Sequence, residues 1–306
     1  MDKYAQGVIP PPPAPAEPTG GSGISRRLRT TIIATAVIVI LVIGIIGYAV
    51  TGLADAQTRV GNADKTLSTV ISHQNTLNTT FKDFDTKFNG LRSGSTFDPK
   101  QARTLVDQFV ANATSAGTTV NQDDSSLISA KAGLGEQQWL TVVARSNLDK
   151  EAGRIDHARK ALSTAKIVAA DYVQDGQFLQ AFLDAAADLN TVGTQSANAD
   201  IAGATTTLAI MKTHVDKALQ LSSGPGLPGE LHSLMVDFQS LVTDFGKLLN
   251  AAAAADDAAI VSAEASVQAD ADKIGKYNFD TIGTEIDTFY KPLVDEFNAE
   301  MAKASA

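Results

Sequence analysis

The 306-residue sequence contains no cysteine. This absence excludes disulfide bonds, thiolate metal sites, a thiol nucleophile and a lipid anchor attached to cysteine. The sequence also lacks any long stretch in which apolar and polar residues alternate with period two, the pattern typical of half-buried strands. We therefore predict an all-α fold that is held together by packing alone.

Motifs that would indicate chemistry are missing as well. We find no Gly-rich phosphate-binding loop, no nucleophile elbow, and no stretch with the ligand spacing of a calcium-binding loop. The histidines stand on different expected helices without the i, i+4 spacing of a helical metal pair, and we interpret each as a surface or hydrogen-bonded core residue. They are His73, His157, His214 and His232. We predict no catalytic residue, no cofactor site, no metal site and no enzyme activity.

Acidic residues are paired at Asp123-Asp124, Asp256-Asp257 and Asp270/Asp272. Acids at the start of a helix are favoured by the helix dipole, so capping explains the second pair without catalysis or calcium. The single tryptophan, Trp139, is compatible with a ligand pocket, but its place on an apolar stripe is more typical of a core residue.

The charge balance is acidic, with a formal net charge of −9 for the whole chain. Residues 1–29 carry four basic and two acidic side chains, a net +2, so the remainder carries about −11. A domain of this charge is repelled by nucleic-acid phosphates and by anionic lipid surfaces. We therefore expect no nucleic-acid partner.

Residues 30–54 form an uncharged run of 25 residues, dominated by Ile, Val, Ala and Leu. A helix of this length reaches roughly 37 Å, enough for the roughly 30 Å hydrocarbon layer of a bilayer. Arg26, Arg27 and Arg29 directly precede it, and basic residues mark the cytoplasmic side. We predict a single-pass transmembrane helix with a cytoplasmic N-terminus and an extracytoplasmic C-terminal domain.

A secretory signal peptide is the alternative interpretation of this run. Ala54-Asp55-Ala56 has the small-x-small spacing of a cleavage site, and cleavage after Ala56 would release a secreted helical protein. However, the apolar region of a signal peptide is usually about 7–15 residues long. Residues 1–29, rich in proline and glycine, have no apolar periodicity, and we predict that they form a disordered cytoplasmic tail.

We expect residues 55–175 to form a membrane-proximal three-helix segment. An a/d stripe typical of coiled coils and antiparallel bundles runs from Val60 to Leu91 and includes the polar residue Gln74, which we expect to set the register. Asp98-Pro99 is a helix start signal. A second helix should kink or end near residues 117–125, and a third should run from Glu136 to about Gln174.

Residues 176–306 are predicted to contain two copies of a helical hairpin, followed by a C-terminal helix and packed with the preceding segment. At an offset of 56 residues, the matching pairs other than alanines are Phe182/Phe238, Asp188/Asp244, Asp200/Asp256, Asp216/Asp272 and Lys217/Lys273. Residues Asn198 to Asp200 follow an expected turn after Gly193. The repeat therefore predicts that Asp256 caps a helix after a turn within Ala251–Ala255, where alanine propensity alone favours an unbroken helix.

Other boundaries in this segment follow from glycine and proline. Residues 222–229 contain Gly-Pro-Gly and Pro-Gly, which no helix crosses. An a/d seam follows from Leu231 to Leu248, and a last helix begins after an interruption around Gly275 to Asn278. Pro292 should kink or break this last helix. Its apolar stripe is expected at Ile282, Ile286, Phe289, Leu293 and Phe297.

At the level of architecture, this pattern resembles the outer helical-bundle domains of bacterial membrane-anchored proteins, including chemoreceptor sensor domains. A receptor of that kind would need a second span and a cytoplasmic transducer, which the sequence does not show. We therefore expect a structural or protein-interaction module of the cell envelope, with an envelope protein as partner. The alternatives are a ligand-sensing ectodomain that works through a partner membrane protein, and self-association through exposed Phe81, Phe84 and Phe88.

Overall fold

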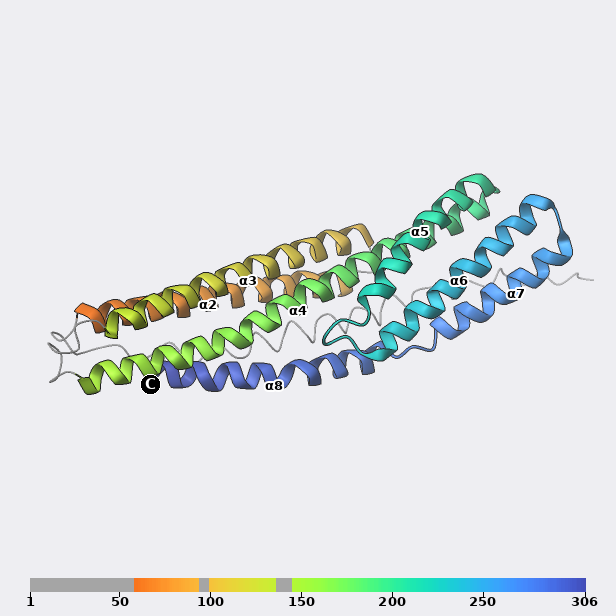
Figure 1. Ribbon diagram of the computed structural model, residues 1–306. Helices are drawn as coiled ribbons and strands as arrows, with labels where there is room; N and C mark the ends of the chain where they lie inside the picture. The colour runs from red at the N-terminus through yellow and green to blue at the C-terminus, as the bar shows by residue number, and fades with distance from the viewer. Residues whose placement is uncertain (1–57, 94–98, 136–144) are drawn as a thin grey trace, which may run out of the picture.

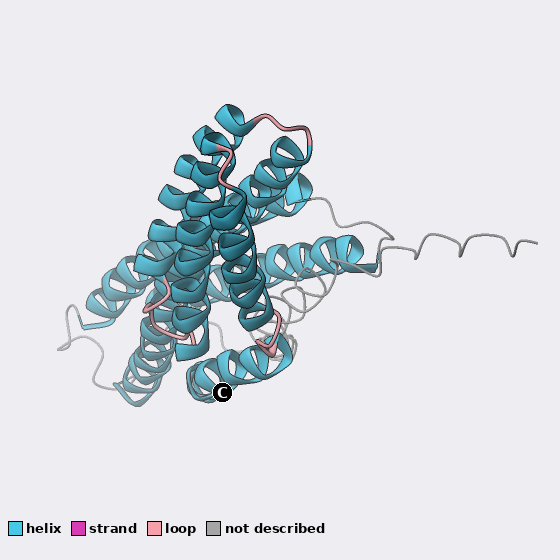
Figure 2. Cartoon of the chain, turned by 90° about the vertical axis from the view of Figure 1, so that its right-hand side faces the viewer, coloured by secondary structure: helices cyan, strands magenta, loops and turns pink. Residues whose placement is uncertain are grey.

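The computed structural model describes residues 58–93, 99–135 and 145–306. These residues form seven α-helices and no strand, which confirms the all-α prediction (Figure 2). None of these seven helices is long and apolar enough to cross a membrane. The predicted tail at residues 1–29, the predicted span at residues 30–54 and Trp139 lie outside the described residues.

The helices form an elongated antiparallel bundle (Figure 1). In chain order they are α2 (Thr58–Ser93), α3 (Pro99–Gly135), α4 (Arg145–Ala197), α5 (Ile201–Leu221), α6 (Gly229–Ala254), α7 (Asp257–Ile274) and α8 (Phe279–Ser305). Helix α4 has 53 residues, which corresponds to a length of about 80 Å. It contacts α2, α3, α5 and α8, and is therefore the central helix of the bundle.

The two ends of the bundle are made of different helices. At one end, here called the basal end, α2 and α4 begin and α3 and α8 finish (Figure 1). At the opposite, distal end lie the turn between α4 and α5 and the turn between α6 and α7. Helix α8 returns antiparallel along α4, since Tyr290 contacts Asp175 whereas Glu300 contacts His157.

Two main cores fill this bundle. The basal core joins α2, α3, α4 and the end of α8, and includes Leu67, Leu127, Ile155 and Leu162. The central core extends to the distal helices and contains six buried aromatic residues: Phe109, Tyr172, Phe178, Phe182, Phe238 and Tyr290. Their rings form two groups of contacts. In one, the ring centroids are 5.5 Å apart from Phe109 to Tyr172 and 5.3 Å apart from Tyr172 to Tyr290. The other joins Phe178, Phe182 and Phe238.

Several sequence-based expectations are confirmed. In α2, Leu67, Val70 and Gln74 are buried on the predicted stripe, and the Gln74 amide donates a hydrogen bond to Asp123 on α3. Helix α3 begins at Pro99, loops separate α5 from α6 and α7 from α8 as predicted, and the α6 seam faces the core. The side chains of Phe81, Phe84 and Phe88 lie outside the described part of the structure.

The expected end of the third helix near Gln174 is wrong, because α4 continues to Ala197. Gly176 lies within the helix where α3 comes closest. A Cβ atom at this position would clash with the Val110 side chain and press on Phe109. Glycine at 176 therefore allows close helix packing and does not mark a turn. The division into residues 55–175 and 176–306 remains a prediction, and α4 runs through it.

The second helix does not end near residues 117–125, because α3 runs to Gly135, and the alternative expectation of a kink there stays a prediction. The polar residues that argued for a break have partners on neighbouring helices. Asp123 binds His73 and Gln74, and Asp124 binds Arg159. These cross-helix contacts outweigh the weak helix propensity of the segment.

One expectation for α8 requires correction, and it concerns the buried face. The helix has no break at Pro292, whose side chain lies on its exposed face, and the alternative expectation of a kink there stays a prediction. Phe289 is 45% exposed, whereas Tyr290 is fully buried. The buried face instead advances in steps of four residues through Ile282, Ile286, Tyr290 and Val294. Steps of four slowly rotate the contact line around the helix, because four residues turn it by more than 360°.

The turns of the two hairpins have the same geometry. Ala199 and Ala255 both adopt positive φ, at 57° and 51°. The following residues, Asp200 and Asp256, accept hydrogen bonds from the Gly203 and Ala259 amides at 2.9 and 3.0 Å. The predicted capping role of Asp256 is therefore confirmed.

Candidate functional site

Each of the four histidines forms a hydrogen bond within the chain, as interpreted from the sequence. His73 binds Asp123 at 2.8 Å, His157 binds Glu300 at 2.6 Å and His214 binds Asp188 at 2.7 Å. His232 binds the Ser222 hydroxyl at 2.9 Å. The four lie on four different helices, and the described residues contain no group of three or more His, Asp or Glu placed to hold a metal ion.

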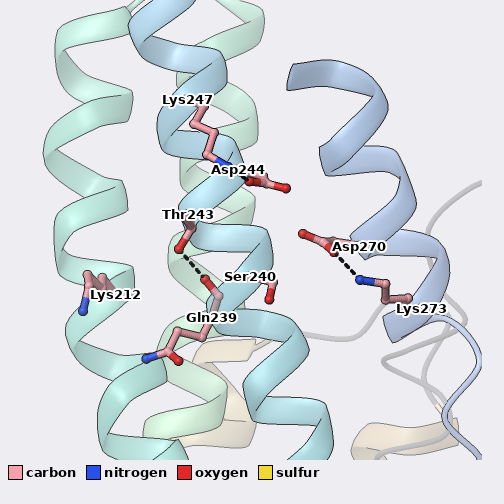
Figure 3. Close-up of a pocket in the computed structure, with 8 residues that line it drawn as sticks. All are labelled: Lys212, Gln239, Ser240, Thr243, Asp244, Lys247, Asp270 and Lys273. Carbon is pink, nitrogen blue, oxygen red and sulfur yellow. Dashed lines mark hydrogen bonds and ion pairs between the residues drawn. The ribbon is translucent and has the colours of Figure 1, made fainter. Parts of the chain in front are cut away.

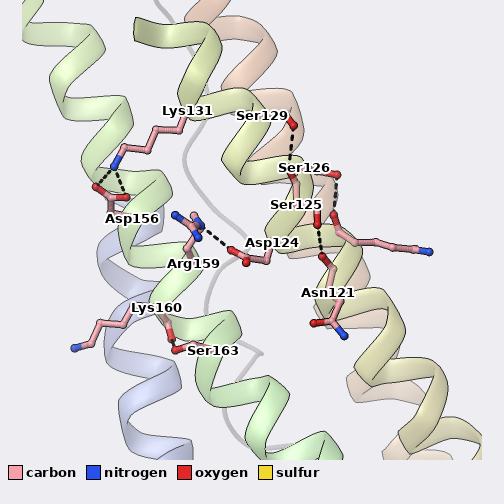
Figure 4. Close-up of polar contacts among 11 residues, drawn as sticks. Asn121, Asp124, Ser125, Ser126, Ser129, Lys131, Asp156, Arg159, Lys160 and Ser163 are labelled. Carbon is pink, nitrogen blue, oxygen red and sulfur yellow. Dashed lines mark hydrogen bonds and ion pairs between the residues drawn. The ribbon is translucent and has the colours of Figure 1, made fainter.

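The paired acids noted in the sequence are separated by the fold. Asp123 is buried between α2 and α3, while Asp124 forms a 2.6 Å ion pair with Arg159 on α4. Figure 4 shows this pair beside a second bridge between the same helices, from Lys131 to Asp156 at 2.6 Å. All four of these bridging side chains are at least 35% exposed. They align two surface helices, and nothing in their geometry indicates a ligand site.

A buried carboxyl lies where α8 crosses α4. The Tyr290 hydroxyl donates a 2.9 Å hydrogen bond to Asp175 Oδ2, and Asp175 Oδ1 has no hydrogen-bond partner. Burial raises the pKa of Asp175 to about 8, with a smaller contribution from the charge of Asp171. Burial also raises the pKa of Asp287 to about 6. The Asp175 carboxyl is therefore protonated at neutral pH.

The loop between α5 and α6 closes over this carboxyl. Gly226 has a φ of 77°, and a Cβ atom there would lie within 2.6 Å of the Tyr290 hydroxyl oxygen. Glycine fits this position for two reasons. It adopts positive φ without strain, and without a Cβ atom it leaves room for the Tyr290 side chain. The carboxyl is covered on this side, so we assign it a structural role.

A pocket of about 490 Å³ opens between α5, α6 and α7 (Figure 3). Every residue that lines it is polar: Lys212, Gln239, Ser240, Thr243, Asp244, Lys247, Asp270 and Lys273. Most of the lining comes from α6, with Lys212 from α5 and the last two residues from α7. Such a lining suits a charged or hydrogen-bonding group better than an apolar ligand.

The lysines of the pocket are paired along their own helices. Lys212 binds Asp216 at 2.5 Å, Lys247 binds Asp244 at 2.6 Å and Lys273 binds Asp270 at 2.9 Å. The side chains of the three lysines are 55–65% exposed. Their ammonium groups therefore remain largely in water, and such pairs contribute little to stability.

Asp270 differs from the other charged residues of the pocket. It is only 4% exposed, and its Oδ2 atom is buried without a hydrogen-bond partner. The hydrogen bond to Asp270, with the charges of Asp270, Asp237 and Asp244, raises the pKa of Lys273. A buried carboxylate oxygen without a donor is unfavourable, so this position favours a ligand that brings a donor.

Comparisons of the chain with protein-family models, with curated proteins and with solved structures give no match. Sequence reasoning considered Asp270 only beside Asp272 and did not connect it with Asp244. The available signal was the 56-residue repeat, which matches Asp188 with Asp244 but places Asp270 opposite His214.

Proposed function

We propose that this protein is an anchored structural and interaction module of a cell envelope. In this proposal residues 30–54 cross the membrane once, the N-terminus is cytoplasmic, and the helical part is extracytoplasmic and binds another envelope protein. Support for the anchor comes from the uncharged 25-residue run and the three arginines before it. The acidic charge of the remainder suits a domain that stands away from anionic lipid.

The observation that best supports the proposal is the length of the bundle, together with the different helix ends found at its two extremities. Helix α2 starts at Thr58, only a few residues after the proposed span, so the anchored chain enters the bundle at its basal end. The α4–α5 and α6–α7 turns lie at the other end of the roughly 80 Å α4 helix. This arrangement favours a spacer that presents its distal hairpins to a partner.

The alternatives from the sequence have less support. The ligand-sensing alternative calls for a largely apolar pocket between helices, whereas the pocket at α5, α6 and α7 is polar. Self-assembly depends on Phe81, Phe84 and Phe88, whose side chains are not among those described. Self-assembly therefore stays an outcome of the test.

Photo-crosslinking in native membranes tests the proposal. A photoreactive residue replaces Val261, which is 68% exposed on α7 near the distal turn, in the full chain. The matched control replaces Ile128, which is 46% exposed on α3 towards the basal end. We expect Val261 to capture one distinct envelope protein that the control does not capture, and a probe on that protein to capture this chain in return.

Other outcomes would contradict the proposal. Adducts between copies of this chain alone would favour self-assembly. Equal capture from both positions would remove the argument for a distal binding end. A mature product that begins at Gln57 and is absent from the membrane fraction would replace the anchor with a secreted protein.

A further inference from the structure

The two distal hairpins can be compared residue by residue because their turns coincide. In both, a positive-φ alanine precedes the capping aspartate, at Ala199-Asp200 and Ala255-Asp256. The Asp200 amide donates to the Gln195 carbonyl, and the Asp256 amide donates to the Ala251 carbonyl, again 56 residues apart. The same offset therefore relates equivalent positions along both hairpins.

One equivalent pair of positions differs in charge. In the first hairpin, Asp188 on α4 binds the imidazole of His214 on α5 at 2.7 Å. The equivalent residues of the second hairpin are Asp244 on α6 and Asp270 on α7. Figure 3 shows their carboxylates pointing toward each other across the groove between the two helices. The second hairpin thus has two acceptors where the first has an acceptor and a donor.

The charges of this groove are paired, but one acid oxygen is left over. Each lysine of the lining forms an ion pair with one carboxylate, Lys212 with Asp216, Lys247 with Asp244 and Lys273 with Asp270. The charge of Asp237 also acts on Lys273. The Tyr277 hydroxyl donates to Asp237 at 2.8 Å. Lys247 and Lys273 bind Oδ1 of Asp244 and of Asp270, and Asp270 Oδ2 still has no partner.

We propose that the groove between α6 and α7 receives the guanidinium group of an arginine on a partner protein, at the place that the His214 imidazole occupies in the first hairpin. This inference rests on the proposed interaction function and names the chemistry of its partner. A guanidinium carries five N–H donors in a planar fork and reaches two carboxylates at once. It also brings a donor for Asp270 Oδ2, which has no hydrogen-bond partner.

The other polar groups of the pocket fit this occupant. The Thr243 hydroxyl donates to the Gln239 carbonyl at 2.9 Å, and the Ser240 hydroxyl donates to the Val236 carbonyl at 3.3 Å. Both hydroxyl oxygens keep lone pairs that accept further N–H donors. A divalent metal ion fits less well, because the described residues contain no group of three or more His, Asp or Glu side chains placed to hold one.

The test uses N-acetyl-argininamide, a small probe whose only charge is the guanidinium, with the full chain in a lipid nanodisc. Binding is followed by the ¹³C-methyl shift of Ala271, the residue after Asp270. Ala218, buried on α5 in the other hairpin, is the internal reference. We expect a saturable shift at Ala271 and none at Ala218.

Three variants sharpen the test. Asp270→Asn keeps the shape of the side chain, removes its charge and should weaken binding roughly tenfold or more. Asp270→His should abolish binding of the probe, because an imidazole opposite Asp244 recreates the pairing of Asp188 with His214. Asp188→Asn is the matched control in the first hairpin and should bind as wild type does. Circular dichroism melts verify that each variant is folded.

Several results would overturn the inference. These are the absence of a saturable shift, a shift that Asp270→Asn leaves unchanged, and a stronger response to calcium than to the guanidinium probe. Failure of the arginine site can be distinguished from failure of the proposed function. If Val261 still captures its partner when Asp270→Asn is present, the interaction module stands and the arginine site does not.

Discussion

The basal and central cores of this protein are stabilised in different ways. The basal core is aliphatic throughout its described members, and polar contacts between helices border it, such as His73 with Asp123 and His157 with Glu300. The central core contains the six buried aromatic rings, with ring contacts from α3 through α4 to α6 and α8. Stability should therefore depend on buried aromatic and carboxyl side chains in the central core and on ion pairs at the basal end.

The largest effect is expected from an aromatic ring of the central core. Phe238 is 3% exposed and packs edge-on against Phe182, with ring centroids 5.7 Å apart. Phe238→Ala should lower the free energy of unfolding by about 3–5 kcal/mol, because it leaves a cavity. Urea denaturation followed by circular dichroism measures this loss. Phe289→Ala, at a 45% exposed position, is the control and should cost about 0.5 kcal/mol or less.

If both phenylalanine variants lost equal stability, the contrast between the buried and exposed faces would be wrong. If Phe238→Ala alone cost less than about 1 kcal/mol, the central core would not depend on aromatic volume as stated here.

The next largest effect is expected at the buried carboxyl of the central core. Burial raises the folded-state pKa of Asp175 to about 8 from its ordinary value of 3.8. Wild-type stability should therefore fall as pH rises from about 4 to about 8, because only the folded state keeps the proton. Asp175→Asn removes the contribution of Asp175 to this dependence. Its free energy of unfolding relative to that of wild type should therefore rise by several kcal/mol from pH 4 to pH 8, at about 1.4 kcal/mol per pKa unit. Urea midpoints measured across this range provide the check.

Asp171 and Asp287 also have raised pKa values, so the Asp175→Asn variant should keep a smaller slope with pH. A stability difference between wild type and variant that stays constant from pH 4 to pH 8 would show that Asp175 is ionised in the fold.

A smaller effect with the opposite pH dependence is expected at the basal end. Glu300 accepts hydrogen bonds from Lys303 and Lys160 and binds His157, and these contacts lower its pKa to about 2. Its contribution should be complete above about pH 4.5 and disappear as pH falls through about 2. Glu300→Gln should therefore destabilise the protein at neutral pH and match wild type in strong acid.

Thermal melts of Glu300→Gln from pH 2 to pH 7 measure this effect, with Glu296→Gln as the control because Glu296 is 45% exposed. A loss that persists unchanged at pH 2 would indicate a packing role for the side chain in place of a charge role.

The smallest effect is expected from the surface bridge between Arg159 and Asp124, whose side chains are 35% and 38% exposed. A double-mutant cycle with Arg159→Ala and Asp124→Ala should give a coupling of about 0.2–1 kcal/mol, since solvent screens the pair. The coupling should decrease in 1 M salt, where the Debye length is about 3 Å. A larger, salt-independent value would mean that the interface between α3 and α4 is drier than its exposure indicates.

The sequence predicted those helix boundaries that are set by residues at the boundary itself, such as caps, glycines and prolines. Asp98-Pro99 marks the start of α3, and the glycines and prolines of residues 222–229 mark the loop between α5 and α6. The repeat predicted the Asp256 cap inside an alanine run, because equivalent turns recur at equivalent positions. These features require few residues, and their physical cause lies within a few positions along the chain.

The errors occurred where distant residues decide the structure. Gly176 could be identified as a packing position only by knowing that Val110 of α3 lies beside it. Tyr290 could replace Phe289 in the core only because Asp175, far away in sequence, accepts its hydroxyl hydrogen bond. The groove at Asp244 and Asp270 has the same origin, since helix pairing brings these two carboxylates together.

Arg154 joins three helices at the basal end, and this affects how the bundle resists a pulling force. Its guanidinium donates to the Ala304 carbonyl at 2.8 Å and to Asp64 at 3.2 Å, so the start of α2 and the end of α8 meet at one point of α4. A pulling force applied between these two segments would peel α8 from α4 one turn after another, at low load. The same force applied between the basal end and the distal turns acts along the α4 axis and must shear several helices at once. The bundle should therefore be stiff against tension along its length and weak against tension on its C-terminal helix.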